Sequence, residues 1–244
     1  MERYIPLYEM AKPSKRHKEK VYYHGTESEK SALSILKKGI NPPDLELRTD
    51  NSLIPRKGKV YITSNLGYAL IYTFGANRVG EQMEKGWWKR YTGRGQYGYI
   101  FEISGKNLKD IEPDEDSIGE MISNKKPLWL YKKAKEIFEY GLLNPEQDFN
   151  INIPEDIKEE LELFSGEFFR GIMQGEYSFW AFGGKILLDY YLTDEEKIKL
   201  IDEGSHIAHT GTLKPSKAWK INLDLIGELK SNGSNFFKYA ERIK

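Results

Sequence analysis

The sequence predicts an α+β protein, because strand-like segments lie near both ends of the chain and helical segments lie between them. Apolar residues make up 39% and aromatic residues 13% of the 244 positions, which is enough to bury a core. Strands alternate with short helices up to residue 108 and return after residue 204, whereas residues 128–202 are mostly helical. We expect one domain over residues 1–244, with a helical insertion at about 128–202.

The composition excludes several classes of function. Lys and Arg together number 37, as do Asp and Glu, so no overall field draws the chain toward nucleic acid or an anionic membrane. The chain has no cysteine, which rules out disulfides, thiolate zinc sites and thiol nucleophiles. The N-terminus lacks the apolar core of a signal peptide, and Lys185 interrupts the longest apolar tract. We expect a cytoplasmic protein with no membrane partner.

The first predicted strand ends at a histidine. Residues 20–24, KVYYH, combine valine and tyrosines, which favour a pleated, half-buried surface, and Gly25 stops the strand. His24 therefore lies where the strand ends and the chain turns. The basic run before it, at residues 12–20, is typical of a solvated leader rather than of an arm that binds phosphates.

A helix, a second strand and a second helix follow. Thr26 and Glu29 have the spacing of a capping box, which predicts that a helix begins there. Gly39 is the expected C-cap of this helix. After a proline-rich loop, strand character resumes at residues 58–64, and NLGYALIYTFGA at 65–76 has the period of a short helix.

A long loop then precedes the third strand. Residues 75–98 contain glycines, two adjacent tryptophans and several arginines, with no sustained period, which predicts a loop or lid. Interleaved cationic and aromatic groups are also typical of proteins that bind single-stranded nucleic acid, so that alternative stays open. YGYIFEIS at residues 97–104 alternates as a strand should.

The second half begins and ends with helix signals. Acidic residues at 114–116 suit the positive end of a helix. Thr193 and Glu196 form a second capping-box pattern, and Gly204 should close that helix. Two strands follow, at residues 205–213 and 218–229. The tail, residues 230–244, should form a charged helix or fray.

The order of these motifs carries a resemblance. A strand with His-Gly-Thr, a helix ending in Lys-Lys-Gly-Ile, a strand with Gly-Lys-Val-Tyr-Ile-Thr, a helix with Ala69 and Tyr72, and YGYIFEIS follow one another. This order resembles the ADP-ribosyltransferase superfamily, in its diphtheria-toxin-like and poly(ADP-ribose)-polymerase-like branch. The resemblance covers roughly residues 20–108, and the last strands more loosely. It implies two small twisted sheets around a cleft for NAD, with helices outside.

The resemblance also implies the residues that contact NAD. His24 and Tyr61 match a histidine and a tyrosine that face one another across the nicotinamide end of the cleft. Tyr72, eleven residues after Tyr61, matches a tyrosine that stacks on the nicotinamide ring. Gly25 lets the backbone approach the nicotinamide amide, since it has no side chain. The full implied set is His24, Gly25, Thr26, Tyr61, Thr63, Ala69 and Tyr72.

Two positions depart from the family pattern. The family places a third catalytic residue, most often glutamate, at the start of a late strand, where Glu203, Ser205 and His206 compete in this chain. We favour His206, because Glu203 belongs to the last turn of a helix that Gly204 closes. Ala69 stands where many members have a serine that binds the nicotinamide amide, and losing that hydroxyl removes about 0.5 to 1.5 kcal/mol of binding.

Other carboxylates and histidines leave further alternatives open. The acidic stretch could reach the cleft, or it could only begin a helix; its residues are Asp114, Asp116 and Glu120. His209, three residues after His206, should point to the opposite face of a strand. Four histidines without a His-x-x-x-His pair give no metal-site motif.

These residues predict a mono-ADP-ribosyltransferase. Loss of nicotinamide from NAD passes through an oxocarbenium-like state, which an enzyme stabilises by holding the amide, the ribose and the developing charge. We expect catalytic roles for four residues: His24, Tyr61, His206 and Glu203. NAD is the expected cofactor and is consumed as the substrate. The expected acceptor is a protein or a nucleic acid. The alternatives are an RNA 2′-phosphotransferase and an inactive binding module of the same fold.

Overall fold

The computed structural model describes residues 15–43, 56–74, 96–141, 168–174, 177–229 and 232–244. These residues form two compact units. The sheet unit takes its described residues from Pro13–Arg48, Pro55–Glu112 and Ser205–Lys244, and the helical unit takes them from Pro113–Gly204.

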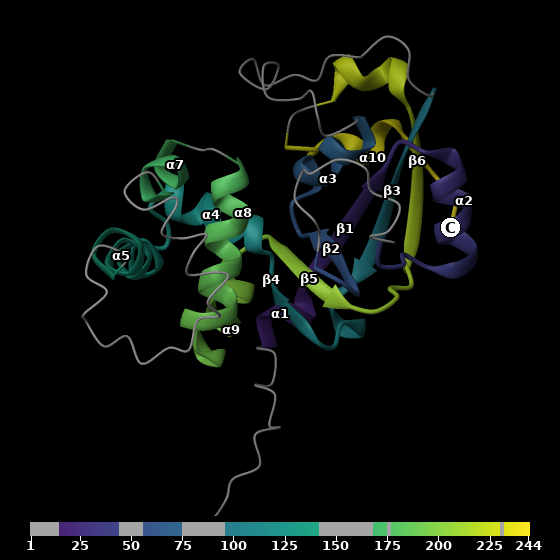
Figure 1. Ribbon diagram of the computed structural model, residues 1–244. Coiled ribbons are helices and arrows are strands. Elements are labelled where there is room, and N and C mark those ends of the chain that lie inside the picture. Colours follow the sequence, from purple (N-terminus) through teal and green to yellow (C-terminus); the bar gives the residue numbers. More distant parts are fainter. Residues whose placement is uncertain (1–14, 44–55, 75–95, 142–167, 175–176, 230–231) are drawn as a thin grey trace, which may run out of the picture. The chain divides into compact units, whose positions relative to one another are not determined.

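The sheet unit is built on one seven-stranded antiparallel sheet (Figure 1), in the order β4-β5-β2-β1-β3-β6-β7. The strands are β1 (Val21–Thr26), β2 (Lys59–Thr63), β3 (Tyr97–Ser104), β4 (Ile111–Pro113), β5 (His206–Thr210), β6 (Lys217–Asn222) and β7 (Ala240–Arg242). The α+β class is therefore observed, whereas the expected pair of separate small sheets is wrong, because hydrogen bonding runs from one edge strand to the other.

The pairing between β1 and β2 is short. These two strands pair at one position, where Tyr23 lies opposite Thr63. By contrast, β1 pairs with β3 along its whole length, and β2 does so with β5. The two halves of the sheet therefore separate beyond Tyr23, and His24 is the first residue of β1 past the junction.

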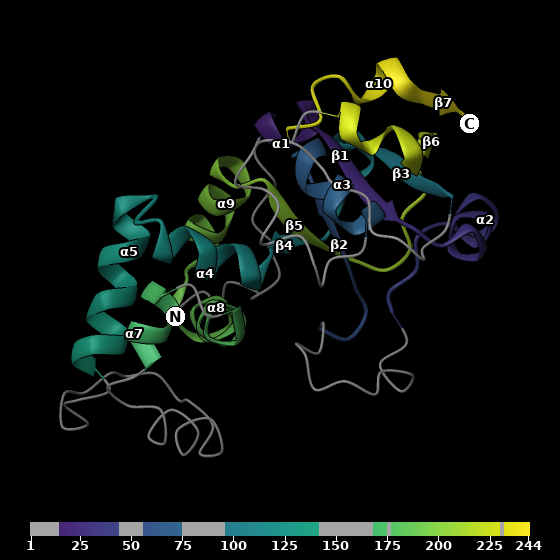
Figure 2. The same ribbon diagram turned by 90° about the horizontal axis from the view of Figure 1, so that it is seen from above.

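Helix α3 (Leu66–Phe74) covers the face of the sheet that carries Gly25 (Figure 2). A Cβ atom at Gly25 would meet the carbonyl oxygen of Ala69, so only glycine allows this approach. The core beneath the helix consists of buried residues from α3, β3, β6 and the C-terminal segment: Ala69, Leu70, Ile100, Ile221, Leu223, Leu229 and Phe236.

Helix α2 (Glu29–Lys38) begins differently from the expectation. Its N-cap is Ser28, whose hydroxyl accepts a hydrogen bond from the N–H of Ser31 at 3.2 Å. Thr26 is instead the last residue of β1, so the predicted capping box is wrong. The predicted C-cap is confirmed, because Gly39 has φ of 96° and donates its N–H to the carbonyl of Ile35.

Both ends of the sheet unit are more ordered than the sequence indicated. Helix α1 (Lys15–Glu19) lies inside the basic run, and the imidazole Nδ1 of its fully buried His17 is 2.8 Å from the hydroxyl of Tyr22. A solvated leader is therefore wrong from Lys15 onward. The tail forms η7 (Leu223–Glu228), α10 (Phe236–Tyr239) and β7, and β7 pairs with β6.

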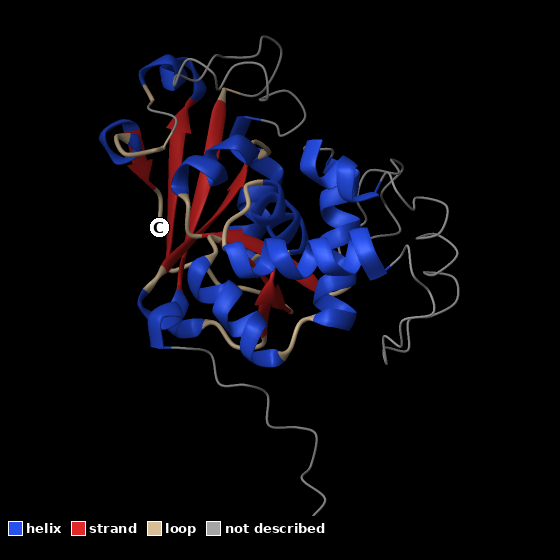
Figure 3. Ribbon diagram, turned by 90° about the vertical axis from the view of Figure 1, so that its left-hand side faces the viewer, coloured by secondary structure: helices blue, strands red, loops and turns tan. Residues whose placement is uncertain are grey.

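The helical unit contains α4 (Glu115–Ser123), α5 (Leu128–Lys135), η5 (Glu136–Gly141), α7 (Phe168–Gln174), α8 (Tyr177–Ile186), η6 (Leu187–Tyr191) and α9 (Asp194–Glu203). Figure 3 draws these helices in blue. The helical layer thus starts before the expected residue 128. The capping box of Thr193 with Glu196 and the closing Gly204 are confirmed. No helix in the described ranges is long and apolar enough to cross a membrane.

Candidate active site

His24 contacts β2 at the point where β1 and β2 separate. Its Nδ1 lies 3.2 Å from the carbonyl oxygen of Tyr61. A carbonyl can only accept, so Nδ1 carries the proton in this contact, and Nε2 of the neutral ring is an acceptor. Burial lowers the pKa of His24, and the hydrogen bond to Tyr61 partly opposes this. His24 is therefore neutral at pH 7 and presents an acceptor nitrogen, Nε2.

Tyr61 is held at both its backbone and its hydroxyl. Its carbonyl accepts from His24, and its hydroxyl accepts from the N–H of Arg56 at 3.0 Å. Because Thr63 lies opposite Tyr23, alternation places Tyr61 on the α3 face and His24 on the other face. The two residues are brought together, but through the backbone of Tyr61 and not as two facing side chains.

A row of directly opposed residues crosses five strands on the α3 face, from β6 to β5: Lys217, Glu102, Tyr23, Thr63 and His206. Lys217 Nζ is 2.7 Å from Glu102 Oε1 at one end of the row. Burial raises the pKa of Tyr23, and the charge of Glu102 adds to the shift. The row thus places His206 on the same face of the sheet as Tyr23 of β1 and Thr63 of β2. These are the strands that carry His24 and Tyr61.

His206 packs against an aromatic pair on α3. The rings of His206 and Tyr68 have centroids 4.1 Å apart and an edge-to-face angle of 69°. Tyr68 in turn lies 6.3 Å from Tyr72, one helical turn later, whose residue surface is 46% exposed. Burial lowers the pKa of His206 to about 4. The structure therefore groups Tyr72 with a neutral His206 through Tyr68.

The remaining implied NAD contacts serve the fold. Ala69 is fully buried, and its carbonyl covers the Cα of Gly25, so neither is open to a nicotinamide amide. The hydroxyls of two threonines accept backbone hydrogen bonds: Thr26 from Ser28 at 3.2 Å and Thr63 from Asn65 at 3.0 Å. These four residues shape the turns and the helix packing beside His24.

The candidates for the third position fall in different units. Glu203 is the exposed last residue of α9 in the helical unit. Ser205 and His206 belong to the sheet unit, where the carbonyl of Ser205 accepts from the N–H of Ser64 at 2.7 Å. His209 faces the opposite side of β5 from His206, as expected, and is buried.

The acidic stretch begins a helix. Asp114 is the N-cap of α4, and its carboxylate accepts from the N–H of Asp116 at 3.0 Å. Burial raises the pKa of Asp114 well above its usual value, and the charges of Asp116 and Glu115 add to the shift. Burial also raises the pKa of Glu120. The helix-start interpretation accounts for Asp114 and Asp116 within the helical unit.

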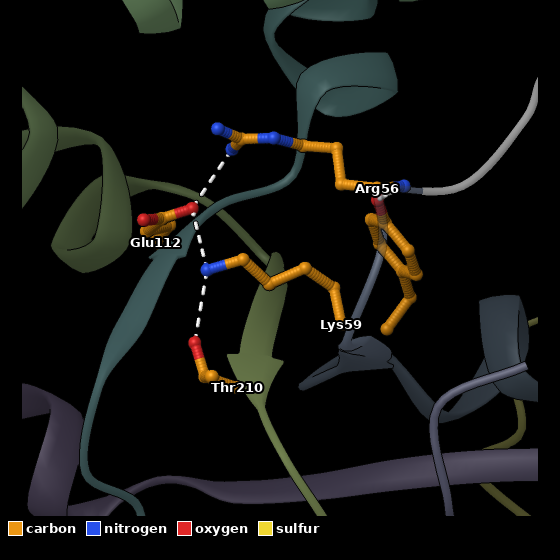
Figure 4. A network of polar contacts seen from close by, with 5 residues as sticks. Arg56, Lys59, Glu112 and Thr210 are labelled. Atoms are coloured by element: carbon orange, nitrogen blue, oxygen red, sulfur yellow. Dashed lines mark hydrogen bonds and ion pairs between the residues drawn. The ribbon is translucent and has the colours of Figure 1, made fainter.

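A second polar cluster lies at the other end of β2 (Figure 4). Arg56 Nη1 and Lys59 Nζ lie 2.8 and 2.9 Å from the same oxygen, Oε2 of Glu112. Lys59 also donates to the hydroxyl of Thr210 at 2.9 Å. The cluster touches the candidate site, because Arg56 donates its backbone N–H to Tyr61.

Sequence reasoning missed three residues on the α3 side of the sheet: Tyr23, Tyr68 and Glu102. Tyr68 could have been found from its spacing of one helical turn before Tyr72. Glu102 could have been found as the one charged residue of YGYIFEIS. The expected lid at residues 75–98 lies outside the described residues up to position 95.

Comparisons with protein-family models, curated proteins and solved structures gave no significant match. Within the described ranges, no group of three or more His, Asp or Glu side chains is arranged to hold a metal ion. The family resemblance therefore depends on the sequence motifs alone.

Proposed function

We propose that this chain is an NAD-dependent ADP-ribosyltransferase, which moves one ADP-ribose from NAD to a protein or nucleic acid and releases nicotinamide. The contact between His24 Nδ1 and the Tyr61 carbonyl, 3.2 Å long, is the observation that supports it best. It joins the two residues that the motifs single out, at the junction where the sheet separates.

Two side chains, Tyr72 on α3 and His24 on the opposite face of the sheet, each offer a contact that suits part of NAD. The half-exposed ring of Tyr72 can stack on a flat cationic ring, worth about 1 kcal/mol where water is partly excluded. Nε2 of neutral His24 can accept a hydrogen bond from a ribose hydroxyl. Gly25 and Ala69 add no contact, since α3 covers them. We therefore expect weaker NAD binding than the family pattern implies.

The bonds broken and formed in the proposed reaction balance. The bond between the ribose C1′ and the nicotinamide nitrogen breaks, and its electron pair leaves with neutral nicotinamide. A bond forms from C1′ to an oxygen or nitrogen of the acceptor, which loses a proton. This proton passes to solvent, because a pKa of about 4 disfavours the protonated form of His206 at pH 7; we assign His206 to orient the acceptor. Since β5 reads HIAHT and carries no carboxylate, we expect a single transfer instead of chain elongation.

An inactive binding module is the second candidate, and the covered Gly25 and Ala69 favour it. NAD labelled on the adenylate, incubated with the full chain in cell lysate or with nucleic acid, separates the candidates. Label on macromolecules together with free nicotinamide supports the transferase and names the acceptor class. Nicotinamide alone indicates an NAD glycohydrolase, and neither signal supports the binding module or the RNA 2′-phosphotransferase.

A matched pair of variants ties that activity to the site. Tyr72→Ala removes a ring from a residue that is 46% exposed, and Phe237→Ala removes one from a residue that is 44% exposed in the same unit. We expect Tyr72→Ala to raise the KM for NAD and Phe237→Ala to leave it unchanged. Equal effects would remove Tyr72 from the proposed site.

A further inference from the structure

Basic side chains gather where β7 continues beside the start of β6. The backbones of Ala218 and Lys244 exchange two hydrogen bonds, of 3.3 and 3.4 Å, which extends the pairing of these strands to Lys244. Figure 2 shows β6, β7 and α10 next to one another in this part of the sheet unit. Four cationic side chains lie here, and we call them the basic corner: Lys214, Lys217, Arg242 and Lys244.

Backbone oxygens hold three of these cations in place. Nζ of Lys214 donates to the carbonyl of Lys38, and Nζ of Lys244 donates to that of Pro215, both at 2.8 Å. Nε of Arg242 donates to the backbone oxygen of Lys244 at 2.7 Å. An ammonium has three donors and a guanidinium has five, so each of these exposed groups keeps donors for a ligand.

Few carboxylates face the basic corner. The described strands β3, β6 and β7 carry two acidic residues, Glu102 and Glu241. Glu102 pairs with Lys217 at 2.7 Å, whereas Glu241 lies opposite Lys220 on the other face of the sheet. Even when a carboxylate at Lys244 is counted, four positive charges meet two negative ones among these described residues. The corner is therefore electropositive in a chain whose formal net charge is zero.

Two aromatic rings continue this surface. Trp219 lies two residues after Lys217 on β6 and directly opposite Arg242 of β7, so these three side chains share the α3 face. The ring of Phe237 on α10 meets Trp219 edge to face, with centroids 4.8 Å apart. Phe237 is 44% exposed. A ring open to solvent therefore lies beside the cations.

Cations beside an exposed ring suit a single strand of nucleic acid. Lys and Arg bind its phosphates, and its unpaired bases stack on aromatic side chains. The bases of a duplex are already stacked on one another, so a duplex would use the cations alone. An acidic polypeptide would likewise pair with the cations, but its carboxylates do not stack on Phe237.

We propose that the basic corner and Phe237 form a binding surface for single-stranded nucleic acid. Lys214, Arg242 and Lys244 contact phosphates, and a base stacks on Phe237. The surface lies apart from the candidate active site, because four strand spacings, about 19 Å, separate Lys217 from His206 along the row on the α3 face. It does not rest on the proposed transferase activity, since it is defined by binding. If both proposals hold, nucleic acid is the acceptor.

Fluorescence anisotropy of the full chain with a labelled DNA or RNA single strand of about 20 nucleotides, over a series of salt concentrations, tests the surface. Arg242→Gln should weaken binding and lower the slope of log K against log salt by about one, because one phosphate contact is lost. Phe237→Leu should weaken binding about fivefold or more and leave the slope unchanged, because stacking involves no counterion.

Two controls accompany these variants. Phe237→Tyr keeps the ring and should bind like the parent, which separates stacking from a folding defect. Lys132→Gln removes an exposed cation of α5 in the helical unit and should change neither affinity nor slope. Thermal unfolding shows whether each variant is folded.

Three outcomes would overturn the surface: a parent that does not bind the single strand at low salt, a duplex or polyglutamate that binds as tightly as the single strand, or Arg242→Gln and Phe237→Leu variants that both bind like the parent. The proposed function stands or falls separately. A parent that binds the strand but neither cleaves NAD nor transfers ADP-ribose keeps the surface and overturns the transferase. A parent that cleaves NAD but binds no strand keeps the transferase and overturns the surface.

Discussion

The imidazole of His24 donates to the carbonyl of Tyr61, across the one position where the sheet begins to divide. The contact gives a partner to a carbonyl of β2 just beyond the single β1–β2 pair. It also fixes the tautomer of His24, so that its second nitrogen accepts. The same hydrogen bond therefore satisfies a backbone carbonyl at the junction of the sheet and leaves Nε2 of His24 as an acceptor.

The first prediction concerns these two residues. His24→Ala and Tyr61→Ala should each lower kcat/KM for nicotinamide release by about 100-fold or more, because the proposed function assigns both residues to the NAD site. Both should stay folded, since the rest of β1 and β2 remains paired. Turnover of NAD at the parental rate in both variants would show that the site lies elsewhere.

The second prediction concerns the pH dependence that His206 confers. Its pKa is lowered from 6.5 to about 4 in the folded state, so the unfolded chain binds the proton more readily between these values. The free energy of unfolding should therefore fall as pH drops from 6.5 toward 4, by about 3 kcal/mol from this residue alone. Above pH 6.5 the residue should add no slope.

Urea unfolding of the parent and His206→Gln across this range measures the effect. The variant should lose less stability on acidification than the parent. His24 and His209, whose pKa values are also lowered by burial, contribute equally to both proteins. Parallel pH profiles for the two proteins would contradict the burial of a neutral His206.

The third prediction concerns helix packing at Gly25. Gly25→Ala should destabilise the protein by about 1 to 3 kcal/mol, because the new methyl group meets the backbone carbonyl of Ala69, which cannot rotate away. Gly58→Asn is the comparison, since Gly58 has open space and a φ of 78° that asparagine tolerates. Urea midpoints should separate the two variants, and equal midpoints would exclude the close contact.

The fourth prediction concerns the buried cap of α4. Burial raises the pKa of Asp114, so ionising its carboxyl at neutral pH costs stability, and this cost grows as pH rises above the usual aspartate range. Asp114→Asn keeps the cap acceptor without the charge and should stabilise the protein at pH 7. Its advantage should vanish near pH 4.

Asp114→Ala provides the control for the cap itself. It removes both the charge and the acceptor for the Asp116 N–H, and it should lose about 1 kcal/mol relative to Asp114→Asn. Thermal unfolding at pH 4 and pH 7 resolves the two contributions. A destabilised Asp114→Asn at pH 7 would mean that the ionised carboxylate is favoured by the helix N-terminus more than burial disfavours it.

Local patterns predicted much of the regular structure. The third strand has the bounds that alternation gave, Tyr97–Ser104, and the Thr193 and Glu196 capping box begins α9. The same local rule failed at Thr26, because strand β1 extends through this residue and Ser28 caps the helix instead. Competing caps a few residues apart differ by little energy, so tertiary pairing decides between them.

The sequence by itself determined the α+β class, most strand and helix positions, the absence of cysteine chemistry, and His24 and Tyr61 as the residues to examine. Only the tertiary structure decided that β1 and β2 pair at a single position, that His24 donates to a backbone carbonyl, and that α3 covers Gly25. It also brought Glu112 between Arg56 and Lys59. Periodicity reports which face of an element is buried, whereas register and contacts between distant segments depend on how whole elements pack.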